Sequence, residues 1–234
     1  MEDKWTMRGL GEKDPHCIKT AEKLLQYIKE VGFLPLFRNE VPGFSVEENV
    51  PARYWWTDDA LRDPWVWRMT LTACEDIAYG KFYEGKAGFV SREWFPYFAC
   101  ARRRGYDFDS RVDEGIAKPD DRRVMALFDE THASWGTNEL KSKTELNKRF
   151  EPAVTRLMWQ GYLVVGDFTQ RVNKSGLPYG WHMSVYTTPE AKWGYDFVTS
   201  AYAEGEEKCK QKILLKLHES FPHADFGVIM GFGK

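Results

Sequence analysis

The sequence lacks any long apolar run. No stretch approaches the roughly 20 apolar residues that a helix needs to cross a bilayer, and residues 1–10 carry charges where a signal peptide would have its apolar centre. The four cysteines are scattered, with no Cys-x-x-Cys, so neither a zinc site nor a disulfide framework is indicated. We therefore expect a cytoplasmic protein with free thiols and no membrane partner.

Histidine is also scarce, and nucleotide-binding motifs are missing. The five histidines contain no pair at i, i+4 spacing, and the chain has no phosphate loop, dinucleotide fingerprint or Gly-x-Ser-x-Gly. We expect no metal and no cofactor. One histidine, His182, alternates with Ser184 and Tyr186 along an expected strand; it is either an acid or base facing a cleft, or a structural histidine.

The chain has no excess of positive charge. Its 33 basic and 35 acidic side chains give a formal net charge of -2, so the global positive field of many nonspecific nucleic-acid binders is absent. Any nucleic-acid contact must come from a local patch. Aromatic residues are plentiful instead, with 10 Trp, which indicates either a thickly packed core or an aromatic-lined pocket.

Residues 1–106 are predicted to form an N-terminal helix and hairpin unit. Apolar residues at helical spacing predict a helix over 20–31, which Thr20 begins and Gly32 ends. Three prolines predict that 33–56 wraps over the surface as an ordered loop. A second helix is expected from Asp63 or Pro64 to Ile77.

A hairpin is predicted over 78–90, because two apolar segments flank a Glu-Gly-Lys turn. Ser91 can then cap a helix that ends in the basic run 102–105. We interpret that run as a solvated helix end rather than a phosphate site. The acidic segment 107–120 is predicted to be a linker.

The second half of the chain contains the signals of three helices and a ribbon. They fall at about 121–133, 137–141 and 151–161 for the helices, 162–171 and 180–187 for the strands, and 173–176 for the turn. This order predicts a winged helix-turn-helix at 121–188 within an α+β fold, with the N-terminal unit packed against it. Residues 189–234 are expected to form C-terminal helices, the first running from Thr188 to about Ala203.

A winged helix normally lays its third helix in the major groove of DNA and rests its ribbon on phosphates. At 100° per residue, Val154, Leu157 and Met158 share the buried face of that helix. The remaining basic and aromatic positions of the module are its DNA-binding candidates: Lys141, Lys143, Lys148, Arg149, Arg156, Trp159, Arg171 and Lys174. The alternative is that these are ordinary solvated charges on a module that contacts proteins.

An aromatic cluster precedes the hairpin. It could line a pocket for a flat small molecule or an unstacked base, and it consists of Tyr54, Trp55, Trp56, Trp65 and Trp67. Core packing is the alternative. Trp55 and Trp56 are adjacent and cannot share one environment, so at least one of them should be partly exposed or reach a pocket.

Three strings identify a family: Glu30–Leu34, Phe82–Phe89 leading to Trp94–Pro96, and Leu157–Val164. With these strings the chain resembles, over most of residues 20–203, the small relatives of the AlkZ and YcaQ family of DNA glycosylases. The resemblance implies winged-helix units and a link to DNA repair.

The larger members of that family release damaged bases, including crosslinked ones, with a Gln-apolar-Gln or Gln-apolar-Asp motif after the first helix. The matching stretch here is Pro35-Leu36-Phe37, and it has neither polar residue. We therefore expect a DNA-binding relative without that activity. The alternatives are a small-molecule binder and a diverged enzyme that uses another carboxylate, for which the candidates are Glu40, Asp58 and Asp59.

Overall fold

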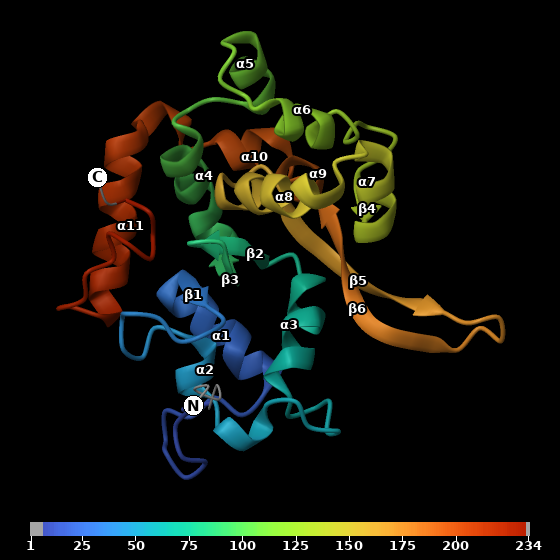
Figure 1. The fold of residues 1–234 in the computed structure, drawn as a ribbon. Helices are drawn as coiled ribbons and strands as arrows, with labels where there is room; N and C mark the ends of the chain where they lie inside the picture. Colours follow the sequence, from blue (N-terminus) through green and yellow to red (C-terminus); the bar gives the residue numbers. More distant parts are fainter. Residues whose placement is uncertain (1–6, 233–234) are drawn as a thin grey trace, which may run out of the picture.

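Strands from both halves of the chain join in one antiparallel sheet (Figure 1). The computed structural model describes residues 7–232 and shows a mixed α+β fold. Its sheet has six strands in the order β1-β3-β2-β5-β6-β4. The strands are β1 (Phe33–Pro35), β2 (Ile77–Tyr83), β3 (Lys86–Ser91), β4 (Ser134–Gly136), β5 (Val164–Val172) and β6 (Pro178–Thr187).

Two hairpins make up most of this sheet. The predicted hairpin of β2 and β3 is confirmed, with Ala78 opposite Val90. The ribbon of β5 and β6 is longer and projects from the body of the protein (Figure 1). The two hairpins meet where Tyr79 of β2 pairs with Val165 of β5. The N-terminal hairpin and the ribbon therefore belong to one continuous sheet.

The first helix follows its sequence signals closely. Helix α1 (Ala21–Val31) begins after Thr20, whose hydroxyl accepts a backbone N–H, and ends at Gly32 with φ 82°. Helix α3 (Pro64–Thr72) begins at the Asp63 cap as predicted. It stops before Ile77, because that residue already belongs to β2 and lies opposite β3.

The expectation of a surface loop over residues 33–56 is wrong. The segment contains β1, helix α2 (Val46–Asn49) and a 3-10 turn at Ala52–Tyr54. The prolines do not keep the segment out of the core: Pro35 ends β1, Pro51 precedes the 3-10 turn, and β1 pairs with β3. The buried apolar residues are Phe33, Leu34, Leu36, Val41, Phe44, Val46 and Val50.

The basic end of helix α4 (Phe95–Arg103) is not solvated as expected. The Arg102 and Arg103 side chains are buried, and the left-handed cap is Arg104 rather than Gly105. Helix α11 (Glu206–Ser220) packs on α4. Arg102 donates to the Phe82 carbonyl at 3.0 Å, and Arg103 donates to Gly161 at 2.6 Å. These distant carbonyl partners draw both guanidinium groups inside.

The predicted three helices and ribbon of residues 121–188 are present with altered bounds. They are α6 (Pro119–Met125), α7 (Thr137–Thr144), a 3-10 turn at Asn147–Arg149, and α8 (Phe150–Trp159) ahead of β5 and β6. The first helix ends about eight residues early, because β4 must reach the edge of β6. The predicted turn closes where the Gly176 N–H donates to the Asn173 carbonyl.

Two connecting regions also differ from expectation. Residues 107–120, predicted as a linker, hold helix α5 (Phe108–Asp113) and the start of α6. After the Thr188 cap, the expected single helix is divided into α9 (Pro189–Trp193) and α10 (Tyr195–Thr199), followed by a 3-10 turn at 202–204. Gly194 separates the two helices with φ 87°, which a continuous helix cannot accommodate.

The core continues from one half of the chain into the other. The predicted buried face of α8 is confirmed, since Val154, Leu157 and Met158 are at most 1% exposed. None of the helices described over residues 7–232 has the length and apolar character needed to span a membrane.

Candidate functional site

The residues at the family's motif position lie in an apolar setting. Pro35 ends β1, and Leu36 is completely buried. The half-buried ring of Phe37 packs on Trp55 at 5.7 Å and on Trp65 at 6.4 Å between ring centroids. Phe37 thus joins the aromatic cluster that the sequence singled out, and it brings no acid, base or amide to that cluster.

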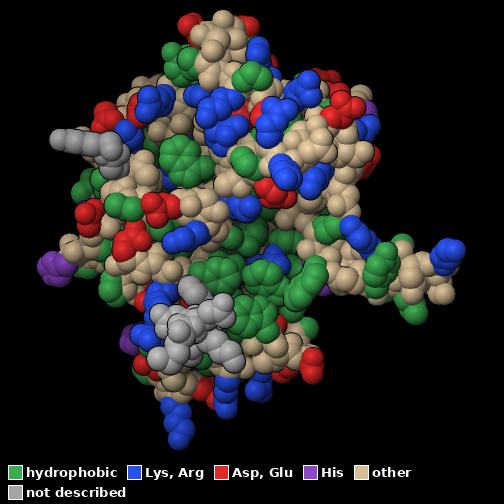
Figure 2. All heavy atoms as spheres, viewed as in Figure 1, with side chains coloured by type: hydrophobic (Ala, Val, Ile, Leu, Met, Phe, Trp, Pro, Cys, Tyr) green, Lys and Arg blue, Asp and Glu red, His purple; other side chains and the backbone are tan. Residues whose placement is uncertain are grey.

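Most of the predicted aromatic cluster is core. Tyr54, Trp55 and Trp67 are 5%, 5% and 2% exposed, whereas Trp65 is half-buried. Trp56 is 55% exposed and has a positive φ of 57°. The adjacent tryptophans are therefore divided between interior and surface, as expected. Hydrophobic side chains gather at the hollowed centre of the face shown in Figure 2, beside α3.

A buried arginine lies at the edge of this cluster. The guanidinium carbon of Arg68 is 3.7 Å from the Trp65 ring centroid and 4.4 Å from that of Phe168 in β5. Tyr79 of β2 is at 5.9 Å, so three elements surround the cation. Arg68 is 4% exposed, its Nε has no hydrogen-bond partner, and it forms no ion pair with any residue in 7–232.

The electrostatics of Arg68 follow from this burial. Burial lowers the pKa of the guanidinium, and the Tyr79 hydroxyl and the Asp63 carboxylate offset only part of the loss. Burial also raises the pKa of Tyr79, which stays neutral at physiological pH. An arginine remains charged even so. The arrangement offers N–H donors and aromatic faces to a planar or anionic group, but it offers no general base.

Sequence reasoning missed Arg68, although a signal was present. Pro64, Trp67, Arg68 and Leu71 recur at helical spacing and are all buried on one face of α3. A charged residue within an apolar helical face is unusual enough to mark a special position. No comparable signal indicated which rings would cover Arg68, because Phe168 lies 100 residues further along the chain.

A second missed residue is the buried carboxylate of Glu47. Its Oε2 accepts from the Arg38 backbone N–H at 3.0 Å, directly after the motif position, and its Oε1 accepts from Arg8 at 3.4 Å. Glu47 is completely buried. Because both oxygens are occupied by backbone donors, this carboxylate holds the segment in place and is not available as a base.

The predicted catalytic candidates lie at the surface. Glu40, Asp58, Asp59 and His182 are all exposed. Asp59 also accepts from the Leu61 backbone N–H at 3.1 Å and pairs with a guanidinium at 3.4 Å. Their catalytic role stays a prediction. Within residues 7–232, no group of three or more His, Cys, Asp or Glu side chains could hold a metal ion.

The predicted DNA-binding residues occupy two kinds of environment. Exposed cations lie on α7, on the turn before α8 and on the ribbon: Lys141, Lys143, Lys148, Arg149, Arg171 and Lys174. Of these, Arg149 pairs with Asp120 at 2.5 Å, and Lys143 lies over the Trp135 ring at 4.9 Å. In Figure 2, Lys and Arg side chains gather over the region of α6 and α8, mixed with acidic ones.

The two candidates on α8 are engaged inside the protein. Arg156 donates its Nε to both Asp121 oxygens, at 2.9 and 3.1 Å, and Asp121 is buried. Trp159 lies 4.2 Å from the Arg102 guanidinium. Lys81 of β2 donates to Thr155 at 3.2 Å. The N-terminal hairpin therefore covers one flank of the helix that was expected to read DNA.

Together these features define an α+β protein with one antiparallel sheet, a projecting ribbon and an aromatic cluster around a buried arginine. The model of the AlkZ-related family matches residues 18–230, so the chain belongs to this family. The expected resemblance is confirmed. No curated protein and no solved structure gives a match.

Proposed function

We propose that this protein is a DNA-binding member of the AlkZ-related family that does not release bases. In this proposal residues 119–187 act as a winged helix-turn-helix. The order α6, β4, α7, α8, β5, β6 supports this interpretation, because three helices and a three-stranded sheet ending in a ribbon are the parts of that module.

Because the N-terminal hairpin covers one flank of α8, we expect other elements to make most of the contacts with DNA. Several exposed cations on α7, on the following turn and on the ribbon have no ion pair within residues 7–232, and they include Lys141, Lys148, Arg171 and Lys174. Contacts from these positions reach phosphates, which fix orientation and carry little sequence information. We therefore expect binding that depends on duplex shape more than on base sequence, as suits a protein that recognises distorted DNA.

One observation carries the proposed lack of activity: Phe37 packs between Trp55 and Trp65 where the family motif places a polar residue. A glycosylase must position or activate water against the sugar carbon, and a phenyl ring cannot. Losing general-base assistance costs about 10² to 10⁴ in rate. In this proposal no nearby carboxylate takes its place: both oxygens of Glu47 accept from backbone N–H groups, and Glu40, Asp58 and Asp59 lie exposed at the surface.

The test combines a binding and a release assay on the whole chain. Fluorescence anisotropy with undamaged, alkylated and crosslinked duplexes should show binding that weakens as salt rises. Lys174→Ala should reduce the salt slope by about one unit. Base release should stay near background. Robust release that is lost in Asp58→Asn or Asp59→Asn would contradict the proposal, as would absence of binding at low salt.

A second candidate is a ligand-binding or enzymatic role for the aromatic cluster. Arg68 favours it, since a desolvated cation with an unpartnered donor is typical of functional sites. Arg68→Met separates the two functions. A variant that binds DNA less well, with unchanged stability, assigns Arg68 to the DNA site. If the Arg68→Met variant binds DNA as well as the unmodified protein does, the aromatic cluster is assigned to another ligand.

A further inference from the structure

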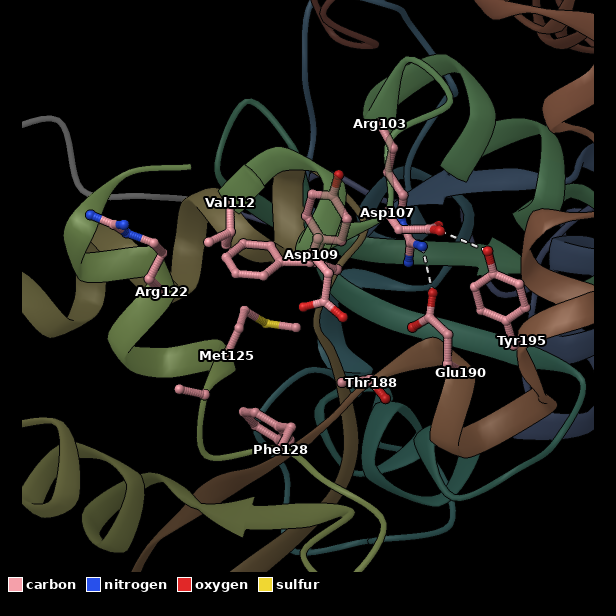
Figure 3. Close-up of a pocket in the computed structure, with 13 residues that line it drawn as sticks. Arg103, Asp107, Asp109, Val112, Arg122, Met125, Phe128, Thr188, Glu190 and Tyr195 are labelled. Atoms are coloured by element: carbon pink, nitrogen blue, oxygen red, sulfur yellow. Dashed lines mark hydrogen bonds and ion pairs between the residues drawn. The ribbon is translucent and has the colours of Figure 1, made fainter. Parts of the chain in front are cut away.

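Figure 3 shows a cavity whose lining includes no residue of the aromatic cluster. It has a volume of about 530 Å³ and lies among α5, α6 and the segment from Thr188 to α10. Pockets for small organic ligands typically fall between about 300 and 1,000 Å³. The cavity is thus large enough for a molecule of two or three fused rings.

One wall of the cavity is apolar. Val112, Met125 and Phe128 lie along it in Figure 3. Phe108 continues this wall and meets the buried Tyr162 ring edge to face, with 5.3 Å between their centroids. Ring edges and a flexible methionine provide a surface on which a flat molecule can pack.

The opposite wall is polar, and its strongest cation is already neutralised. Arg103 is buried and donates to Glu190 at 2.5 Å and to the Tyr202 hydroxyl at 3.2 Å. Burial alone would lower the pKa of Arg103, but Glu190 and Tyr202 outweigh it and raise that pKa. Because Arg103 and Glu190 neutralise each other, this ion pair presents no net charge to a ligand.

One carboxylate oxygen of Asp107 has no hydrogen-bond partner. Its Oδ2 accepts from the Tyr195 hydroxyl at 2.6 Å, whereas its Oδ1 is inaccessible to solvent and has no hydrogen-bond partner. The Tyr195 bond keeps that hydroxyl neutral, since it raises the pKa of Tyr195 to about 12. Asp109 adds a second carboxylate to the cavity, against a single further cation, Arg122. Arg103 Nε is also buried without a hydrogen-bond partner, so the wall has an unsatisfied donor as well as the Asp107 acceptor. The charges of the lining favour the acceptor: Arg103 and Glu190 neutralise each other, and Asp107 and Asp109 outnumber Arg122, so a ligand with an N–H donor and a positive charge fits best.

We propose that this cavity binds a flat, amino-bearing aromatic cation, with its rings against Phe108 and Met125 and its nitrogen donating to Asp107. The site is independent of DNA binding. It would give the protein a small-molecule ligand in addition to its proposed nucleic-acid partner. Occupancy would also brace α5 and α6 against α9.

The test uses two dyes of nearly equal shape. 9-Aminoacridine is cationic at neutral pH and acridine is largely neutral, so their difference reports the combined effect of the amino group and the positive charge. We would titrate each dye by fluorescence into nuclease-treated whole protein, because both dyes also bind nucleic acid. We expect saturable binding of 9-aminoacridine, and binding of acridine that is weaker by about tenfold, the effect of one charge-assisted hydrogen bond.

Three variants locate the site. Asp107→Asn should weaken 9-aminoacridine about tenfold and abolish the preference between the dyes. Asp113 is an exposed acid at the other end of α5 and does not line the cavity, so Asp113→Asn should change neither affinity. Val112→Phe places a larger side chain on the apolar wall, so the cavity becomes narrower and the binding of both dyes should weaken.

Three results would overturn the proposal. They are absence of saturable binding, equal affinity for the two dyes, and an equal loss in Asp107→Asn and Asp113→Asn. Circular dichroism of each variant shows whether it is folded. If Asp107→Asn does not fold, the expected loss of dye binding in Val112→Phe still tests whether the dyes bind in this cavity.

Discussion

The ion pair between Arg156 of α8 and Asp121 of α6 predicts that Arg156 stabilises the fold. The Asp121 side chain in α6 is 3% exposed, and the guanidinium of Arg156 covers it with two donors, Nε and Nη2. Arg156→Ala would leave this carboxylate buried without a partner. The side chain that sequence analysis assigned to DNA should therefore be a structural one.

The size of the effect follows from the burial of the pair. Removing one partner of a fully buried ion pair costs about 3 to 5 kcal/mol. The Arg156 side chain is 24% exposed, so water can reach the vacated space and reduce that cost. We expect the free energy of unfolding to fall by about 2 kcal/mol. Arg156→Lys should lose about half as much, because it keeps the charge without the two-pronged contact.

A neighbouring pair supplies the matched control. Arg149, in the turn just before α8, pairs with Asp120 of α6, but the Arg149 side chain is 64% exposed. Arg149→Ala should therefore cost at most about 1 kcal/mol. Both variants would be measured by urea unfolding followed through tryptophan fluorescence, and both by DNA anisotropy at several salt concentrations.

Two outcomes would refute this reasoning. Equal stability losses in the Arg156→Ala and Arg149→Ala variants would show that the Asp121 pair has no special burial cost. A drop of about one unit in salt slope for Arg156→Ala, with no loss of stability, would show that Arg156 contacts phosphate. The expected result is the reverse, with the slope change confined to cations such as Lys174.

Three further predictions concern single side chains. Arg68→Met should keep or raise the free energy of unfolding in urea, because methionine fills similar space without the desolvation cost; a loss above about 2 kcal/mol would show that cation stacking holds the fold. Tyr195 should titrate at about pH 12 by NMR of ¹³C-labelled tyrosine. Its folded pKa lies above the unfolded value, so the stability from its bond to Asp107 is present below about pH 10 and is lost between pH 10 and 12; Asp107→Asn should lower the pKa. Gly194→Ala should lower the melting temperature through a cost of about 1 kcal/mol, since φ is 87° and no atom lies within 4 Å of the added methyl group; an unchanged melting temperature would exclude strain.

Local signals predicted the local elements. Thr20 and Gly32 marked both ends of α1 because capping depends on neighbouring backbone groups alone. The same holds for the ribbon turn, where Asn173 Oδ1 accepts from Ser175 and Leu177. The predicted buried face of α8 also needed only helical geometry.

The site could not be assembled from such signals, because its partners are far apart in the sequence. The basic run at the end of α4 appeared solvated, yet Arg103 meets Glu190 from 87 residues away. Arg156 appeared to face outward, yet it meets Asp121 from 35 residues away. The basic run was assigned to solvent and Arg156 to DNA, because in each case the counter-charge lies on an element whose position only the tertiary structure supplies.

The shared sheet leads to a last prediction, about the chain as a whole. A fragment that begins at residue 107 would contain all of the proposed winged helix, yet we expect it to aggregate or to unfold at lower urea than the full chain. It would lose the β2 strand that pairs with Val165, so an edge of β5 would be open. It would also lose Arg103, which leaves Glu190 without its ion pair, and Lys81, which contacts α8 through Thr155. Size-exclusion chromatography and urea unfolding of the fragment would decide the matter. A monomeric fragment with the full chain's unfolding midpoint would show that the N-terminal hairpin is an accessory, and that the covered flank of α8 is not needed for folding.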